Sequence, residues 1–175
     1  MEIRRLDKEK YKGKKFTAYY KTNGYYDVII SDDEYKFNYV TFDKTVDKSF
    51  DDEFFGEWLE DPIAYGTYEN GKLIGYVEGS IKSWNNRFRI SNICVFDETY
   101  RDSGIGTKLI YAIEKVAISL KVRMIVLETQ TCNEKAIAFY RKNGYAVIGF
   151  DLYSYSNHDL EDHEVRIEMG KKVKE

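Results

Sequence analysis

The sequence predicts an α+β fold in which a mixed, largely antiparallel central sheet contains one βαβ unit and is flanked by helices. Two observations predict it. Residues 63–96 form three strand-like runs separated by turn residues, and residues 90–127 form a strand, a glycine turn, a helix and a second strand. At 175 residues, the chain is long enough for a single domain over 1–175, with a motif-bearing core at about 64–150.

The composition excludes several classes of protein. Cys94 and Cys132 are too few and too far apart for a disulfide framework, and no Cys/His group has the spacing of zinc ligands. The net charge of -3 argues against a nucleic-acid partner. No signal-like segment or apolar stretch of ~20 residues indicates a membrane protein. We expect a cytoplasmic monomer or homodimer without a metal.

The charge is distributed unevenly. Residues 27–61 contain 12 Asp and Glu residues against three lysines. Such a run is commonly a solvated surface, and it can also attract a cationic substrate.

Two Asn-Gly pairs predict type I′ hairpins in the first half of the chain. Asn23-Gly24 separates Lys14–Lys21 from Tyr25–Ser31, and Asn70-Gly71 separates Ile63–Tyr68 from Leu73–Trp84. Asn85-Asn86 then predicts a turn into a third antiparallel strand.

Between these hairpins, Ser49 and Asp52 resemble a capping box. Aromatic and aliphatic residues follow at helical spacing, so we expect a short helix that ends near Pro62.

The second half alternates helices and strands. An apolar stripe predicts a helix over 107–120, and the apolar run Met124–Leu127 predicts a buried strand. A second helix is expected over about 133–143, with Asn133 as its cap and Gly144 as its stop. Residues 145–151 and 164–169 alternate like two closing strands.

The glycine turn at Arg101–Gly106 predicts an anion site, because its backbone N–H groups and the following helix dipole favour phosphate. A P-loop is excluded, since the Gly-Lys-Ser/Thr ending is absent. A Rossmann fingerprint matches only in part: Leu109 stands where a third small residue belongs, although Glu128 lies at about the right distance for a ribose contact.

A second motif favours a third kind of phosphate site. The run Arg101-x-x-Gly104-x-Gly106, followed by Asn133-x-x-Ala136-x-x-Phe139-Tyr140-x-x-x-Gly144-Tyr145, resembles the GNAT superfamily of N-acetyltransferases over about 64–150. Within this superfamily, the chain resembles the streptothricin acetyltransferases. The resemblance lies in the acidic N-terminal third and in two runs, Leu127-Glu128-Thr129-Gln130 and Gly149-Phe150-Asp151-x-x-x-Tyr155.

The resemblance implies acetyl transfer from acetyl-CoA to a primary amine of a cationic small molecule, by direct attack in a ternary complex. Streptothricin is the expected acceptor, and its acetylation would confer antibiotic resistance. The alternative acceptors are another polyamine-like metabolite and a protein amine. The alternative function is that of a non-catalytic coenzyme A sensor.

The resemblance also implies coenzyme contacts. The pyrophosphate would lie on the backbone of the glycine turn and the pantetheine arm along the preceding strand, where a free N–H near Cys94 or Val95 would receive the thioester oxygen. Asn133 matches a residue that contacts the pantetheine or a nearby backbone. The expected contacts are Ile93, Cys94, Val95, Arg101, Asp102, Ser103, Gly104, Ile105, Gly106, Thr107, Asn133 and Tyr140.

Tyr140 matches the family tyrosine that protonates the leaving thiolate. Ser91 or Asn92 stands where relatives carry a carboxylate, so Glu128 is the expected base or ammonium ligand. Cys94 is expected to be a small apolar residue and not a nucleophile. Acceptor contacts are expected from Asp27, Asp32, Asp33, Glu34, Tyr35 and Glu128.

Overall fold

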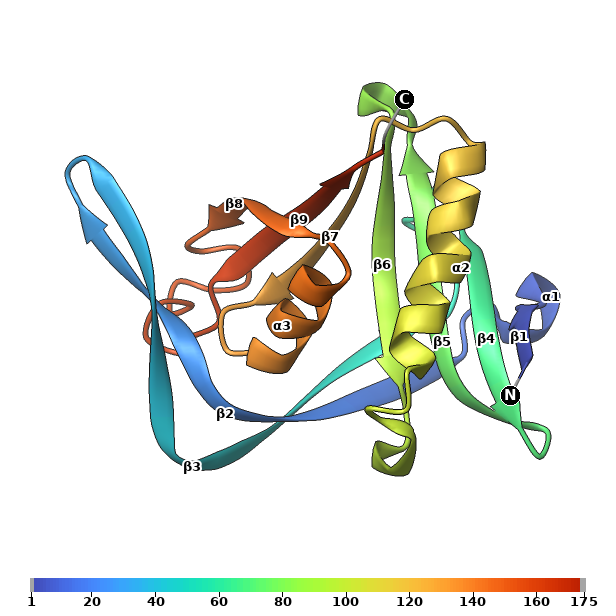
Figure 1. Cartoon of the computed structure of the whole chain (residues 1–175), viewed down its shortest axis with the longest axis horizontal. Coiled ribbons are helices and arrows are strands. Elements are labelled where there is room, and N and C mark those ends of the chain that lie inside the picture. Colours follow the sequence, from blue (N-terminus) through green and yellow to red (C-terminus); the bar gives the residue numbers. More distant parts are fainter. Residues whose placement is uncertain (1, 174–175) are drawn as a thin grey trace. The chain divides into compact units, whose positions relative to one another are not determined.

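The computed structural model describes residues 2–173 and has an α+β architecture (Figure 1). A seven-stranded sheet has the order β1-β4-β5-β6-β7-β9-β8, and β2 and β3 pair separately. The strands are β1 Glu2–Arg5, β2 Lys15–Ser31, β3 Glu34–Glu53, β4 Ile63–Glu69, β5 Lys72–Lys82, β6 Arg87–Val95, β7 Met124–Gln130, β8 Ala146–Asp151 and β9 Arg166–Lys172. The helices are α1 Lys8–Tyr11, α2 Ile105–Ser119 and α3 Glu134–Lys142, with 3-10 turns η1 Ser83–Asn85 and η2 Glu98–Tyr100.

The described residues form two compact units. Unit 1 comprises 2–18, 49–126 and 172–173, and unit 2 comprises 19–48 and 127–171.

The three-stranded meander predicted over 63–96 is confirmed in unit 1. Strand β4 pairs with β5, and β5 with β6, both antiparallel. Asn70 and Gly71 both have positive φ angles, 49° and 77°, as a type I′ turn requires. Strand β6 runs parallel to β7, and α2 connects them, so the predicted βαβ unit is also confirmed.

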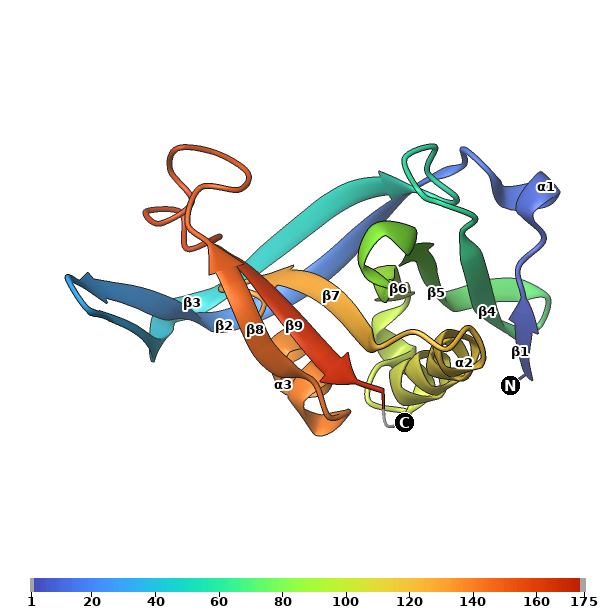
Figure 2. The same cartoon turned by 90° about the horizontal axis from the view of Figure 1, so that it is seen from above.

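Helix α2 covers one face of β4, β5 and β6 (Figures 1 and 2). Its apolar stripe is buried there, with Leu109 and Ile113 fully inaccessible to solvent. Gly75 on β5 permits the close approach, because a Cβ at this position would lie 3.0 Å from the Cys94 carbonyl oxygen and 3.4 Å from Leu109. Gly75 therefore lies on the side of β5 that faces the helix.

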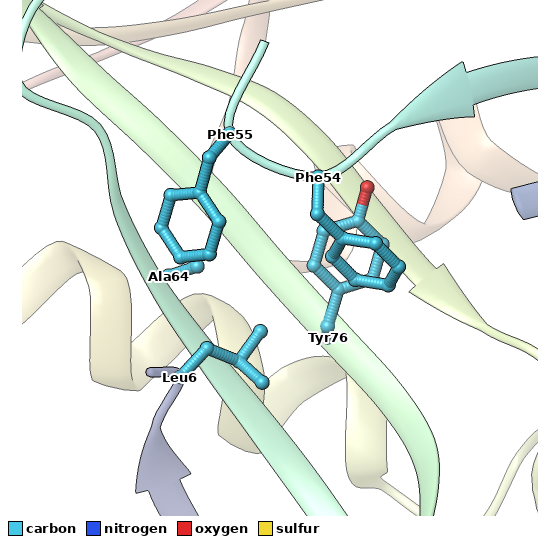
Figure 3. Packing of buried hydrophobic residues seen from close by; sticks show 5 residues of the cluster. All are labelled: Leu6, Phe54, Phe55, Ala64 and Tyr76. Carbon is cyan, nitrogen blue, oxygen red and sulfur yellow. The ribbon is translucent and has the colours of Figure 1, made fainter. Parts of the chain in front are cut away.

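The opposite face of β5 supports an aromatic cluster (Figure 3). Phe54 packs on Tyr76 with ring centroids 4.6 Å apart, and Tyr76 stacks on Phe96 at 5.7 Å. Phe55, Ala64 and Leu6 extend the cluster. The sheet of unit 1 thus has an aliphatic, helix-covered face and an aromatic face.

The hairpin predicted at Asn23-Gly24 is wrong. Strand β2 runs through both residues, and the chain turns at 32–33, just before β3. Gly24 is needed for a close approach of β3, since a Cβ here would lie 2.3 Å from the Val40 carbonyl oxygen. Asn23 serves as a connector instead, because its N–H donates to Glu134 (2.8 Å) and its Oδ1 accepts from Thr45 (2.8 Å).

The helix predicted after Ser49 is also wrong. Strand β3 continues to Glu53, and the chain then turns through 54–61. The Phe54 N–H donates to the Lys14 carbonyl at 3.0 Å, and the Phe54 carbonyl accepts from Gly13 at 2.9 Å. These tertiary bonds and the burial of Phe54 outweigh the helical pattern of the segment.

The predicted helices and strands of the C-terminal half are confirmed. Helix α2 begins at Ile105, two residues earlier than expected. In unit 2, Asn133 caps α3 by accepting the Ala136 N–H at 3.3 Å, and Gly144 follows the helix at φ 88°. Strand β9 pairs antiparallel with β8. The single domain expected over 1–175 stays a prediction.

Shortening Ile113 should destabilise unit 1. Ile113→Ala removes a fully buried side chain from α2, so we expect a loss of about 2–5 kcal/mol in the free energy of unfolding, measured by urea denaturation. Ile118→Ala is the matched control, because Ile118 is on the same helix and 54% exposed. Equal losses in both variants would contradict this packing.

Candidate active site

The predicted anion site lies at the N-terminal end of helix α2 in unit 1. Asp102 and Gly104 have positive φ angles of 59° and 83°, which turn the chain sharply between η2 and the helix. No side chain caps the helix at Gly104, and the first intrahelical bond runs from the Lys108 N–H to the Gly104 carbonyl at 3.1 Å. The N–H groups of Ile105, Gly106 and Thr107 precede this bond and are available to an anion.

Three further contacts hold the turn in place. The Ser103 hydroxyl donates to the Tyr100 carbonyl, and the Asp97 carboxylate accepts the Thr99 N–H at 2.9 Å. Arg101 Nε contacts the Val95 carbonyl at 3.5 Å. The last contact joins the turn to the end of β6, so the residues expected to bind pyrophosphate and pantetheine adjoin each other.

The end of strand β6 adjoins the turn. Within unit 1, β6 pairs with β7 through Arg87–Arg89 and Met124–Val126. Ile93, Cys94 and Val95 are half-buried and pair with β5 along one edge of β6. The other edge of β6 is the one to which an extended ligand would add, as a further strand would.

Cys94 is a thiol in this environment. Burial raises its pKa to about 11, although Arg101 opposes the shift. Because the thiolate is the nucleophilic form, this supports the expectation that Cys94 is not a nucleophile.

A buried carboxylate that sequence reasoning missed lies on the aromatic face of unit 1. Glu78 on β5 is 0% exposed, and its Oε1 accepts the Phe55 N–H at 2.8 Å. Oε2 has no hydrogen-bond partner within residues 2–173. Burial raises the pKa of Glu78 to about 7, and the charge of Asp52 adds to this shift, while the Phe55 N–H and the Asn92 side chain oppose it.

The sequence did contain a signal for this residue. Glu78 interrupts the run Leu73–Ile81, in which a charged residue has no solvated side to occupy. Charged residues are rarely buried without a functional or paired role. Its cross-strand neighbour is Asn92, one of the two positions at which the family resemblance implies a carboxylate.

The remaining expected catalytic residues lie in unit 2. Tyr140 is on α3, 7% exposed, with its ring 6.2 Å from that of Tyr145. Glu128 on β7 forms an ion pair with Arg166 (Oε2 to Nε 3.0 Å). Asn133 is the cap of α3, which was one of its two expected roles.

The expected acceptor contacts surround the β2–β3 turn of unit 2. Asp27 is half-buried, while Asp32, Asp33 and Glu34 are exposed. Tyr35 packs against Phe150 with ring centroids 5.0 Å apart. Exposed carboxylates such as these attract cations weakly at physiological salt, so their role in binding stays a prediction.

Residues 2–173 contain no cluster of three or more His, Cys, Asp or Glu side chains arranged to hold a metal ion. None of their helices is long and apolar enough to cross a membrane.

A profile of the acetyltransferase (GNAT) family matches residues 29–145, which is more than half of the chain. The chain belongs to the acetyltransferase (GNAT) family. This confirms the resemblance inferred from the two motifs, and it agrees with the mixed sheet and the βαβ unit of the structure.

Individual relatives agree with this assignment. A streptothricin acetyltransferase of Escherichia coli is 36% identical over 96 residues, which are 55% of this chain and about half, 54%, of that protein. A crystal structure of nourseothricin acetyltransferase has a TM-score of 0.77 at 23% identity, covering 98% of this chain and 99% of the other.

A second solved structure carries a bound coenzyme. A Bacillus anthracis protein described as a streptothricin acetyltransferase, in complex with acetyl coenzyme A, has a TM-score of 0.68 at 24% identity. The alignment covers 98% of both chains. At this identity, both solved structures show that the chain has the same fold.

The buried Glu78 should make stability depend on pH. Its pKa is about 7 in the folded protein against an ordinary 4.5, so the folded state holds the proton more tightly. The stabilisation that the folded state gains from binding this proton is complete below pH 4.5 and is lost as the pH rises through 7. Because Glu78→Gln stays neutral, its stability relative to wild type should rise by roughly 2–3 kcal/mol between pH 4 and 8.

Urea unfolding of both proteins across this pH range measures the difference. A constant difference between them would show that Glu78 is ionised normally in the folded protein.

Proposed function

We propose that the protein is an acetyl-CoA-dependent N-acetyltransferase that acetylates a primary amine of streptothricin and thereby confers resistance to it. The observation that carries the proposal is the uncapped start of α2 behind the Arg101–Gly106 turn, in a chain of the acetyltransferase (GNAT) family. The named activity of the Escherichia coli relative supports the choice of acceptor. A cytoplasmic location is part of the same proposal.

The donor would bind along unit 1. The N–H groups of 105–107 and the Arg101 side chain would hold the pyrophosphate, together with the backbone of 102–104. The edge of β6 away from β5, at Ile93, Cys94 and Val95, would hold the pantetheine arm. A free N–H of β6 near Cys94 or Val95 would then stabilise the oxyanion formed when the amine attacks the thioester.

The family resemblance also assigns roles in the reaction to residues of unit 2. Tyr140 would protonate the departing thiolate, and Asn133 would support the pantetheine arm while it caps α3. Glu128 already forms an ion pair with Arg166, so we assign it to binding of the acceptor ammonium group and not to proton transfer. The acidic residues at 27–34 and Tyr35 would attract the cationic acceptor.

Release of coenzyme A thiol from acetyl-CoA tests the reaction. Purified protein should release thiol when streptothricin is present, and little without it, as followed with a chromogenic disulfide reagent. Spermidine and a lysine-containing peptide test the alternative acceptors. Tight coenzyme binding with no turnover on any acceptor would instead identify a coenzyme sensor.

Tyr140→Phe should lower kcat by about 10²–10³ while the Kd for acetyl-CoA changes little, because the ring remains and only the proton donor is lost. Tyr145→Phe is the matched control, since Tyr145 is the buried neighbour of Tyr140. A Tyr140→Phe enzyme with wild-type kcat would remove the acid role from Tyr140.

A further inference from the structure

The proposed reaction requires a group that removes a proton from the acceptor. An alkylammonium ion cannot attack a thioester until it becomes a neutral amine. Neither Ser91 nor Asn92 on β6 can take up this proton, and Glu128 is paired with Arg166. Glu78 remains as a carboxylate whose surroundings favour proton uptake.

Glu78 is held in a fixed position with one oxygen free. The Phe55 N–H binds Oε1 at 2.8 Å, while the buried Oε2 has no partner among the described residues. Phe55 has a φ angle of 55°, which is strained for a bulky residue and costs of order 1–3 kcal/mol. The turn after β3 is therefore held in an unfavourable conformation that directs its N–H at the carboxylate.

A second carboxylate lies in the same network. Asp52 at the end of β3 accepts the Asn92 Nδ2–H on Oδ2 (2.8 Å) and the Glu53 N–H on Oδ1 (2.8 Å). Asn92 is the cross-strand neighbour of Glu78 on β6, so its amide lies between the two acids. The negative charge of Asp52 disfavours a second charge on Glu78.

The other polar groups facing this network do not neutralise it. Tyr76 lies two residues before Glu78 on the same face of β5, and burial keeps its pKa well above the ordinary value, so the phenol is neutral. Its hydroxyl is buried and has no hydrogen-bond partner among residues 2–173. Cys94 is a neutral thiol, and Ala64 on β4 is apolar. No cation of the described chain is recorded as acting on Glu78.

The carboxylate is close to the proposed thioester position. Tyr76 pairs with Cys94 across β5 and β6, and Glu78 pairs with Asn92. Two residues along a strand span about 7 Å, so Glu78 lies one such step from the strand segment that would hold the thioester. An amine that attacks there would be near enough to pass its proton to Glu78, directly or through one intervening polar group.

The same turn lines a surface pocket suited to a cation. Phe55 lines a pocket of about 470 Å³ together with Glu53, Glu57, Trp58, Lys12 and Gly13. Lys12 opposes a cation here, but the two carboxylates outnumber it, and together with the indole ring they favour an ammonium group. Phe55 thus contacts both the pocket, through its lining, and Glu78, through its N–H.

We propose that Glu78 accepts the proton of the acceptor ammonium group, and that Asp52 and Asn92 set its affinity for that proton. The N–H bond of the ammonium ion breaks, and Glu78 becomes a neutral acid. The amine then forms the C–N bond, the C–S bond breaks, and the thiolate takes up the second proton of the nitrogen by way of Tyr140. Glu78 finally releases its proton to solvent. This inference rests on the acetyl transfer proposed above.

The pH dependence of kcat/KM tests it. In wild type, kcat/KM for streptothricin should rise with pH through an apparent pKa near 7, because the base must be ionised. This rise of kcat/KM with pH is the ascending limb of the pH profile. Glu78→Gln should abolish the limb and lower kcat/KM at pH 8 by a factor of about 10²–10⁴. The Kd for acetyl-CoA should change less than about threefold, since only the acceptor side is altered.

Asp52→Asn distinguishes proton transfer from a structural role. Removing the Asp52 charge should lower the proton affinity of Glu78 and move the limb to lower pH, by up to about one unit. Glu78→Asp should retain the limb with reduced kcat. Glu60→Gln is the matched control, because Glu60 lies on the same segment, is exposed and bonds only Ser83 among its recorded partners, so both the limb and kcat should be unchanged.

The outcomes separate the two proposals. If wild type releases thiol with streptothricin but Glu78→Gln keeps its rate or its limb, Glu78 is not the proton acceptor and the acetyl transfer stands. An unmoved limb in Asp52→Asn likewise overturns the assignment. If wild type acetylates none of the acceptors, the proposed function fails, and the role of Glu78 fails with it.

Discussion

The packing of helix α2 against β4, β5 and β6 is the constraint on which the site depends. Ile105, the first residue of α2, is buried, and so is Leu109 one turn later, so the helix cannot shift without exposing apolar surface. Its first N–H groups are fixed as a result, and no side chain caps them. An anion site of this kind needs no cationic cluster, because rigid backbone donors and the helix dipole favour phosphate without reorganisation.

Strand β5 connects this anion site to the acceptor chemistry. Gly75 faces α2, whereas Tyr76 belongs to the aromatic cluster and Glu78 lies on the same side of the strand as Tyr76. One strand therefore supports the proposed coenzyme-binding helix α2 on one side and the proposed proton acceptor on the other. The cost is a buried carboxylate with one unpartnered oxygen and a strained Phe55, features that persist in proteins where the surrounding structure over-determines them.

Local patterns predicted those parts of the fold that local interactions determine. Asn70-Gly71 forms its turn because both residues tolerate positive φ, and Asn133 and Gly144 delimit α3 as caps do. Gly24 and Ser49 misled the prediction, since their roles come from strands distant in sequence: β3 passes close to Gly24, and Lys14 and Gly13 bond the backbone after β3. Glu78 interrupts an apolar run but was missed, because its surroundings come from segments distant in sequence: the Phe55 N–H binds it and Asn92 is its cross-strand neighbour. The glycine turn was found because its function depends on its own backbone.

The most direct test of the central claim is a titration of ¹⁵N-labelled protein with acetyl-CoA, followed by the backbone amide resonances. If the entrance to α2 holds the pyrophosphate, the amides of Ile105, Gly106 and Thr107 should show the largest changes, together with those of Cys94 and Val95. Acetyl-CoA that binds while these amides remain unchanged would contradict the account and place the coenzyme elsewhere on the protein.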